Sequence, residues 1–504
     1  SYKHLKTLTL LSLAAFLGSC TGGRNSSSGT TEPIGPNYEG TLKEGFTDLA
    51  NPDPNPAVDE DGNYEVAGQK FSTKTSYNTI FQTTPDNFNY LCDPWQYNAL
   101  YTINMVDGLI SNNQYGATYG GLALGYKVVE NDDGTETWTF QLKEKVKWID
   151  NATGSVYGYV TADDFVAGLE YVLDPINASE FSYLPCGIIK NADAYYLSKN
   201  AALDDPNAKV MDFSEVGIKA VDDYTLEYTL VEPTPYFLTC LTYSVYYPVN
   251  RKFLEEKGTE FGKTQNDILV NGAFRLTNHV ASASSVFKKN PYYYDVEHVY
   301  VDTVNLTFIG KSDSIDAARK LYESGKIDGF NVQSSDEEGY KKYVLGADGT
   351  GTTNNPADPN CSAVASTDQF CFIAYFNYIR LNYEYDSKAH QKTEGEKADT
   401  QKAILNVNFR KGFLYGLNVM NYLKYYNQGD PVQRLNRTYT VKGLAQDASG
   451  KDYVDYVEDV YNEKQGTKDV QLIGTDIAES GKGDDPVYNA AKAKAYFAQA
   501  KTEL

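Results

Sequence analysis

Few residues of this 504-residue chain have the types and spacing that enzyme chemistry or metal binding requires. The sequence has four histidines, which are scattered, and it contains neither an H-E-x-x-H nor a G-x-S-x-G motif. Acidic residues are abundant, but the sequence does not show which two carboxylates would face each other across a cleft. We therefore predict that the protein has no catalytic residues, no cofactor and no metal ion, although an exported enzyme remains an alternative.

Two short segments resemble ligand loops and fail on spacing. The segment GTEFGKT (258–264) has three residues, not four, between its first glycine and Gly-Lys-Thr, so it does not form a phosphate loop. The segment DEDG (59–62) resembles part of a calcium loop, but Ala57 would occupy the first ligand position and Gly68 the closing glutamate position. We interpret both segments as surface turns.

One cysteine near the N-terminus has a context that indicates a chemical modification. Lys3 and Lys6 precede a short apolar run at 8–17, which is too brief to span a bilayer as a helix, and the run ends in Leu-Gly-Ser-Cys. These four residues resemble a bacterial lipobox, in which Cys20 receives lipid. We predict a lipoprotein signal peptide at 1–20; the alternatives for Cys20 are a metal ligand, half of a disulfide, or an accidental cysteine in an ordinary signal.

The composition after this segment is that of an acidic globular protein. Residues 21–40 are rich in Gly, Ser, Thr and Pro, so we predict a flexible tether and N-terminal extension over 21–69. The net charge of −22 makes nucleic acid an improbable partner. The 43 tyrosines reflect either a compositional habit or an aromatic-lined pocket. The sequence has no C-x-x-C, and the other cysteines are either isolated thiols or include a Cys361–Cys371 bridge.

The periodicity of the remaining chain predicts a mixed α/β fold. Alternating aromatic and polar residues predict strands over 137–149, and a strand that begins at 225 is stopped at Pro233. Apolar residues at helical spacing predict helices. The expected helices are 161–173 with Thr161 as N-cap, 313–328 ended by Gly325, and 406–426.

Several segments in order resemble the oligopeptide-binding proteins of bacterial ABC importers, which form the extracellular solute-binding protein family 5. The resemblance rests on TWTFQLKEKVKWID with VTADDFVAGLEYVLDP, then VGIKAVDDYTLEYTLVEPTPYFL, YYPVNRKFLEE, VNGAFRLTNHV, FKKNPYYYD, ESGKIDGFNV, FIAYFNYIR and NVNFRKGFLYGLN. Each segment alone is weak evidence for the resemblance, but the series in this order is strong evidence. It covers most of residues 75–430.

The resemblance implies an α/β fold of the periplasmic-binding-protein type (type II, cluster C), with two lobes around a hinge and an inserted extra domain. Lobe I would comprise 70–101 and 248–368, lobe II would be the insertion at 102–247, and a partial lobe III would be 369–504. The family places peptide between lobes I/II and III. In the family the helix AKAKAYFAQAKTEL lies in the middle of lobe III, so we expect an incomplete third lobe.

The resemblance also implies a function and a set of ligand contacts. The expected protein is a monomeric, non-enzymatic receptor, lipid-anchored to the outer face of the cell membrane, which captures peptides for a membrane permease. The alternatives are another solute (dipeptide, nickel chelate or sugar) and a surface adhesin. Core packing is an equal alternative for each of the ligand-facing candidates, which are Trp95, Gln96, Tyr97, Tyr243, Asn331, Phe372 and Tyr375. Asn418 occupies a position where the family usually has Asp.

Overall fold

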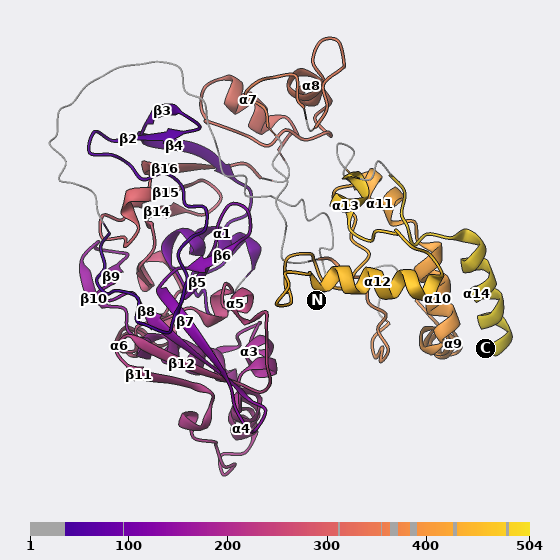
Figure 1. The fold of residues 1–504 in the computed structure, drawn as a ribbon, viewed down its shortest axis with the longest axis horizontal. Coiled ribbons are helices and arrows are strands. Elements are labelled where there is room, and N and C mark those ends of the chain that lie inside the picture. The colour runs from indigo at the N-terminus through magenta and orange to yellow at the C-terminus, as the bar shows by residue number, and fades with distance from the viewer. Residues whose placement is uncertain are drawn as a thin grey trace. The chain divides into compact units, whose positions relative to one another are not determined.

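The chain of the computed structural model is described over residues 36–93, 95–310, 313–353, 355–362, 371–383, 391–426, 431–479 and 483–504. It divides into two units, Ser1–Asn331 and Val332–Leu504 (Figure 1). Cys20 and the tether predicted to follow it lie outside the described residues as far as residue 35. The predicted lobe boundaries stay predictions.

A five-stranded antiparallel sheet forms the centre of the first unit. Its order is β1 (Thr47–Asp48), β7 (Ala123–Glu130), β8 (Glu136–Leu142), β12 (Thr225–Leu230) and β11 (Ile218–Asp222). The strands predicted within 137–149 are confirmed as β8 and β9 (Lys147–Asp150), and β12 ends three residues before Pro233. Large apolar side chains occupy alternate positions along β8 and β12, so one face of this sheet buries Phe140 and Tyr228 almost completely.

Helix α2 (Ala162–Val172) packs against this sheet and confirms the helix predicted over 161–173. Thr161 and Asp164 form a capping box, in which Asp164 Oδ2 accepts a hydrogen bond from Thr161 N at 3.0 Å. The same oxygen accepts a hydrogen bond from Trp148 Nε1 at 2.8 Å, so the start of α2 is attached to β9. Gly168 permits close packing, because a Cβ there would lie 2.4 Å from the carbonyl oxygen of Tyr247.

A second sheet brings together two distant parts of the first unit. Its order is β14 (Phe274–Val280), β15 (Ser284–Lys289), β16 (Val301–Phe308) and β4 (Lys74–Phe81), and β4 runs parallel to β16. Helix α1 (Gln96–Met105) packs on β14, and its Tyr101 hydroxyl lies 2.9 Å from Ser285 Oγ of the neighbouring strand β15. The chain between β4 and β14 contains most of the five-stranded sheet.

Short elements complete the first unit. They are β2 (Asn63–Val66), β3 (Gln69–Ser72), β5 (Ile110–Asn112), β6 (Thr118–Gly120), β10 (Val156–Tyr159), β13 (Leu269–Val270), α3 (Tyr183–Ile188), α4 (Ala192–Asp204), α5 (Phe237–Cys240), α6 (Arg251–Lys257) and α7 (Ala317–Glu323). The helix predicted over 313–328 is therefore shorter than expected, and it does end before Gly325, whose φ of +72° suits glycine.

The regular elements described in the second unit are helices, and turns and irregular segments connect them. Its helices are α8 (Glu337–Tyr340), α9 (Glu394–Leu405), α10 (Val407–Gly416), α11 (Val419–Tyr426), α12 (Tyr453–Gln465), α13 (Gly474–Glu479) and α14 (Ala490–Glu503). Phe409 and Phe413 of α10 pack against Phe497 of α14 with ring centroids 5.8 and 5.9 Å apart. Gly412 lies between them, where a Cβ would come within 2.6 Å of the Phe497 ring.

The single helix predicted over 406–426 is wrong, because a second asparagine cap, at Asn418, divides it. Asn406 Oδ1 accepts a hydrogen bond from Phe409 N at 2.8 Å and starts α10. Asn418 Oδ1 accepts one from Asn421 N at 3.0 Å and starts α11. Asparagine therefore serves as a helix cap at the position where the resemblance led us to expect aspartate.

Among the helices built from described residues, none combines the length and the apolar composition needed to cross a bilayer. The five cysteines of those residues, at 92, 186, 240, 361 and 371, are free thiols. The Cys361–Cys371 bridge is therefore not formed, and isolated thiols are the correct alternative.

Candidate ligand-binding surfaces

Trp95 and Tyr97 lie where helix α1 begins, and both reach the surface of the first unit. Trp95 is 47% exposed, so core packing does not explain it. The Tyr97 hydroxyl donates to Asp86 Oδ2 at 2.9 Å. Burial and this carboxylate raise the pKa of Tyr97 to about 12, so its hydroxyl stays protonated at neutral pH. Gln96 is the first residue of α1.

The loop before α3 lies against the segment that leads to Trp95. Ser179 Oγ donates to the carbonyl of Leu91 at 2.7 Å, and Glu180 N donates to the carbonyl of Cys92 at 3.1 Å. This loop continues to Tyr183, which starts α3 and is largely exposed. These two hydrogen bonds therefore connect the surroundings of Trp95 to those of Tyr183.

Tyr243 belongs to the same part of the first unit. It is 42% exposed, and its backbone N–H donates to the carbonyl of Cys240 at the end of α5. Burial raises the pKa of Tyr243, and the neighbouring Cys240 and Tyr183 side chains raise it further. Tyr236, one residue before α5, is also exposed. Figure 1 shows α1, α5 and α3 in succession along one side of this unit.

We name this region the aromatic surface, and its residues are Trp95, Tyr97, Tyr183, Tyr236 and Tyr243. Aromatic rings with one exposed face bury apolar groups of a ligand, and their hydroxyls donate and accept hydrogen bonds. Such walls accept varied side chains and supply no reactive group. The sequence predicted three of these residues. Tyr183 and Tyr236 were missed, because the folded chain brings Tyr183 close to Tyr243 and Tyr236 close to Cys240.

Asn331 lies elsewhere in the first unit. It is exposed and follows a segment that is attached to strand β4. There Asn78 N donates to Asp328 Oδ2 at 2.6 Å, and Asp328 N donates to the carbonyl of Asn78 at 2.8 Å. In the part of the chain that the structure describes, no contact connects Asn331 to the aromatic surface. Its role in ligand binding stays a prediction.

Phe372 and Tyr375 lie together in the second unit with a residue that sequence reasoning missed. Cys371 Sγ donates to the carbonyl of Tyr439 at 3.0 Å. The Tyr375 and Tyr439 rings meet edge to face with centroids 6.1 Å apart. The three aromatic side chains are between 66% and 71% exposed, which excludes core packing for them. Nothing in the local sequence NRTYTVKG (436–443) distinguishes Tyr439, because a contact 64 positions away in sequence defines its place.

A buried ionisable group of the first unit has a structural explanation. Asp107 Oδ2 accepts hydrogen bonds from the hydroxyls of Tyr294 at 2.5 Å and Tyr293 at 3.1 Å. Burial raises the pKa of Asp107 to about 6, while it lowers the pKa of the nearby Lys143 to about 8. Lys143 Nζ donates to the carbonyls of Gly120 and Gly121. These contacts hold the end of α1 and the turns around it, and we assign them no ligand.

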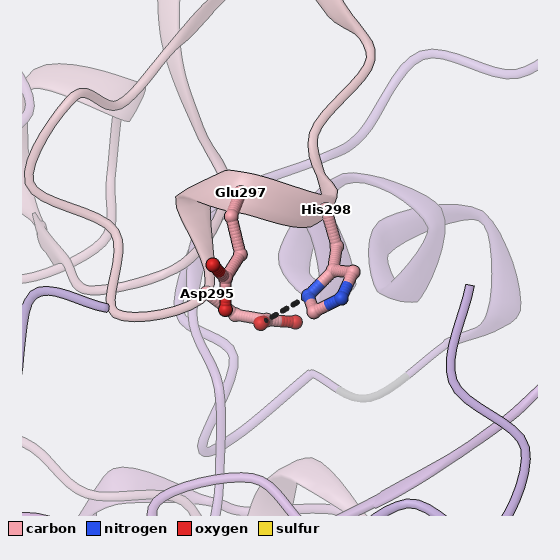
Figure 2. Close-up of side chains that lie close together, drawn as sticks. All are labelled: Asp295, Glu297 and His298. Carbon is pink, nitrogen blue, oxygen red and sulfur yellow. Dashed lines mark hydrogen bonds and ion pairs between the residues drawn. The ribbon is translucent and has the colours of Figure 1, made fainter. Parts of the chain in front are cut away.

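One group of side chains has the donor types of a metal site. Asp295, Glu297 and His298 lie on one short turn with their ligand atoms within 4.8 Å of one another (Figure 2). His298 Nδ1 lies 2.5 Å from Asp295 Oδ1, and this contact raises the pKa of His298. The imidazole is therefore the partner of Asp295 in an ion pair, and nothing else at this turn points to a cation. We therefore assign no metal to the Asp295–Glu297–His298 turn.

Comparison with known proteins relates this chain to bacterial solute-binding proteins. A family model described as bacterial extracellular solute-binding proteins, family 5 Middle, matches residues 118–504. The oligopeptide-binding protein AliB of Streptococcus pneumoniae is 32% identical over 447 residues, which are 87% of this chain and 62% of AliB. The oligopeptide-binding protein SarA of Streptococcus gordonii is 31% identical over 437 residues, which are 85% of this chain and 59% of SarA.

A solved structure extends the comparison to the fold. Peptide-bound OppA of Listeria monocytogenes matches with a TM-score of 0.54 at 22% identity, over 86% of this chain and 69% of OppA. This match confirms the α/β binding-protein fold. The chain spans about six tenths of the length of the curated relatives AliB and SarA.

Proposed function

Family 5 of the bacterial extracellular solute-binding proteins is the family to which this chain belongs, and on that premise we propose that the protein captures peptides outside the cytoplasm and delivers them to the permease of an ABC importer. The observation that carries the proposal is the family match over residues 118–504, together with relatives whose names describe oligopeptide binding. The protein acts as a monomeric receptor and changes no bond in its ligand.

The exposed aromatic residues support a peptide as the ligand. A peptide backbone repeats one donor and one acceptor per residue, and a site that pairs them with its own backbone binds without reading side chains. Rings such as Trp95 and Tyr243 in the first unit, and Tyr375 and Tyr439 in the second, then receive side chains of varied shape. Asn331, which is exposed, would add amide hydrogen bonds.

The N-terminal segment supports attachment to the membrane. Lipid on Cys20 would anchor the protein to the outer face of the cell membrane, since two acyl chains give stable attachment where one gives marginal binding. A tether of about 20 residues has an end-to-end distance near 25 Å, which would allow the receptor to approach its permease.

Growth on peptides tests this function. A strain that lacks the gene and requires one amino acid should not grow when that amino acid is supplied only as short peptides. The wild-type gene should restore growth, and a Trp95→Ala, Tyr243→Ala double variant should restore it poorly. Normal growth of the deletion strain, with peptide import measured directly and intact, would contradict the proposal.

The same variant separates the receptor from the rival functions. An adhesin would retain cell attachment when the aromatic surface is altered, whereas import would fail. A receptor for a nickel chelate or a sugar would leave peptide growth unaffected and impair uptake of that solute instead.

A further inference from the structure

Three side-chain oxygens near the start of α1 are buried without a hydrogen-bond partner. They are the Oδ1 atoms of Asn89, Asp93 and Asn98, and none has a donor among the described residues. Asn98 is only 4% exposed. A buried oxygen that loses its water hydrogen bonds and gains no donor costs about 1–3 kcal/mol, so a ligand that bound these three oxygens would stabilise this part of the chain.

The three residues contact one another through Asp93. The backbone N–H of Asp93 donates to the carbonyl of Asn89 at 3.0 Å, and Asn98 Nδ2 lies 3.5 Å from the carbonyl of Asp93. Asn87 Nδ2 donates to Asp93 Oδ2 at 2.8 Å, so Oδ1 is the carboxylate oxygen that remains. Asn89 Nδ2 donates to the Tyr171 hydroxyl at 3.0 Å, which directs Asn89 Oδ1 away from that bond.

The surroundings are negatively charged. The carboxylates of Asp86, Asp93 and Glu180 all raise the pKa of Tyr97. Over the described ranges, no lysine or arginine forms an ion pair with any of these three carboxylates. The helix dipole makes the first turn of α1 positive and opposes a cation by about 0.3–1 kcal/mol. This repulsion is smaller than the attraction that a nearby carboxylate exerts on a cation in a poorly solvated site.

We propose that the Oδ1 atoms of Asn89, Asp93 and Asn98 bind a calcium ion beneath the segment that presents Trp95 and Tyr97. A water molecule donates at most two hydrogen bonds, so at least two waters would be needed for the three oxygens, whereas one cation can bind all three. A set of carboxylate and amide oxygens without nitrogen or sulfur suits calcium, whose coordination is irregular, better than magnesium or a transition metal.

The role of this ion differs from peptide capture, because the ion would stabilise the first unit and would not be a transported solute. It cross-links positions on both sides of residue 95, before α1 and within its first turn. It therefore stabilises the entry to α1 whether or not peptide is bound.

Calcium titration of the protein after EGTA treatment tests the site, with ionic strength held constant by choline chloride. An extracellular site of this type has a Kd of about 0.1–1 mM, so about 10 mM calcium should raise the melting temperature by about 2–5 °C. Terbium should bind at the same oxygens, luminesce when tryptophan is excited, and be displaced by calcium.

Three variants make the result specific. Asn98→Leu should weaken calcium binding by at least about tenfold, because ligand number and charge set the affinity of such sites. Asn98→Asp should be less stable than wild type in EGTA, and calcium should raise its melting temperature by more than it raises that of wild type. Because Asn98→Leu should reduce the calcium response and Asn98→Asp should increase it, the test stays decisive if Asn98→Leu fails to fold. Glu297→Gln alters the Asp295–Glu297–His298 turn and should leave the response unchanged.

Two outcomes would overturn the proposal. One is the absence of any calcium-dependent shift or terbium signal in the wild type. The other is a calcium response that survives in Asn98→Leu or disappears in Glu297→Gln. Peptide binding is measured in neither arm, so failure of this site and failure of the proposed function are distinguishable.

Discussion

Replacement of Asp164 by asparagine should remove a large pH dependence from the stability of the first unit. Asp164 is 4% exposed, and its Oδ2 accepts hydrogen bonds from Trp148 Nε1 and Thr161 N. Burial raises the pKa of its carboxyl from 3.8 to about 7, against the opposing effects of these two hydrogen bonds and of Arg251. Asparagine keeps an oxygen for both donors and has no proton to release.

The sign and size follow from the pKa difference between the folded and unfolded states. Because the folded carboxyl binds its proton more tightly, the stability that it contributes is fully present below pH 3.8 and is lost as the pH rises through about 7. Each tenfold change in proton affinity corresponds to about 1.4 kcal/mol, so the loss amounts to about 4 kcal/mol. Asp164→Asn has no carboxyl group at this position, so its stability does not fall in this way as the pH rises.

Urea unfolding at several pH values measures the effect. The three tryptophans, at 95, 138 and 148, all lie in the first unit, so their fluorescence reports its unfolding separately from that of the second unit. The free energy of unfolding of Asp164→Asn, relative to wild type, should rise by about 4 kcal/mol between pH 4 and pH 8. Other titrating groups, including Asp107, cancel in this difference.

The neighbouring residue gives the control. Asp163 pairs with Arg251 at the surface, with N–O distances of 2.9–3.0 Å, so Asp163→Asn should change the same difference by less than about 1 kcal/mol. A difference between Asp164→Asn and wild type that stays constant across the pH range would refute the reasoning.

Three other variants test separate parts of the account. Gly412→Ala should destabilise the second unit by about 1–3 kcal/mol, because its Cβ would meet the Phe497 ring, and far-ultraviolet circular dichroism should show the loss while the tryptophan transition stays unchanged. Tyr439→Ala should weaken peptide binding about five- to tenfold by calorimetry through loss of its ring, and Tyr439→Phe should not; equal effects of the two variants would argue against ring contact. Cys20→Ala should move the protein from the membrane fraction to the medium and leave peptide affinity unchanged.

Local rules account for the elements that the sequence predicted well. Thr161 and Asp164 are spaced as a capping box, and the apolar positions that follow have helical period, so α2 was predictable almost to the residue. The break between α10 and α11 was missed because Asn418 was compared with a family aspartate and not considered as a helix cap. Local chemistry was thus informative in both places.

The candidate site depends on contacts that the sequence does not display. Trp95, Tyr97 and Tyr243 were identified by their position within a family resemblance, and the structure places them at the surface. Tyr183 and Tyr439 lie beside such residues only because distant segments meet. The unpaired Asn98 oxygen likewise needed coordinates, because hydrogen-bond satisfaction is a property of the folded chain.

Calorimetric titration with a pool of short peptides tests the central claim most directly, using protein expressed from the complete gene. The account predicts saturable binding heat with peptides, weakened in the Trp95→Ala, Tyr243→Ala variant and absent when the same amino acids are added free. Folded protein that gives no heat with any peptide pool would contradict it.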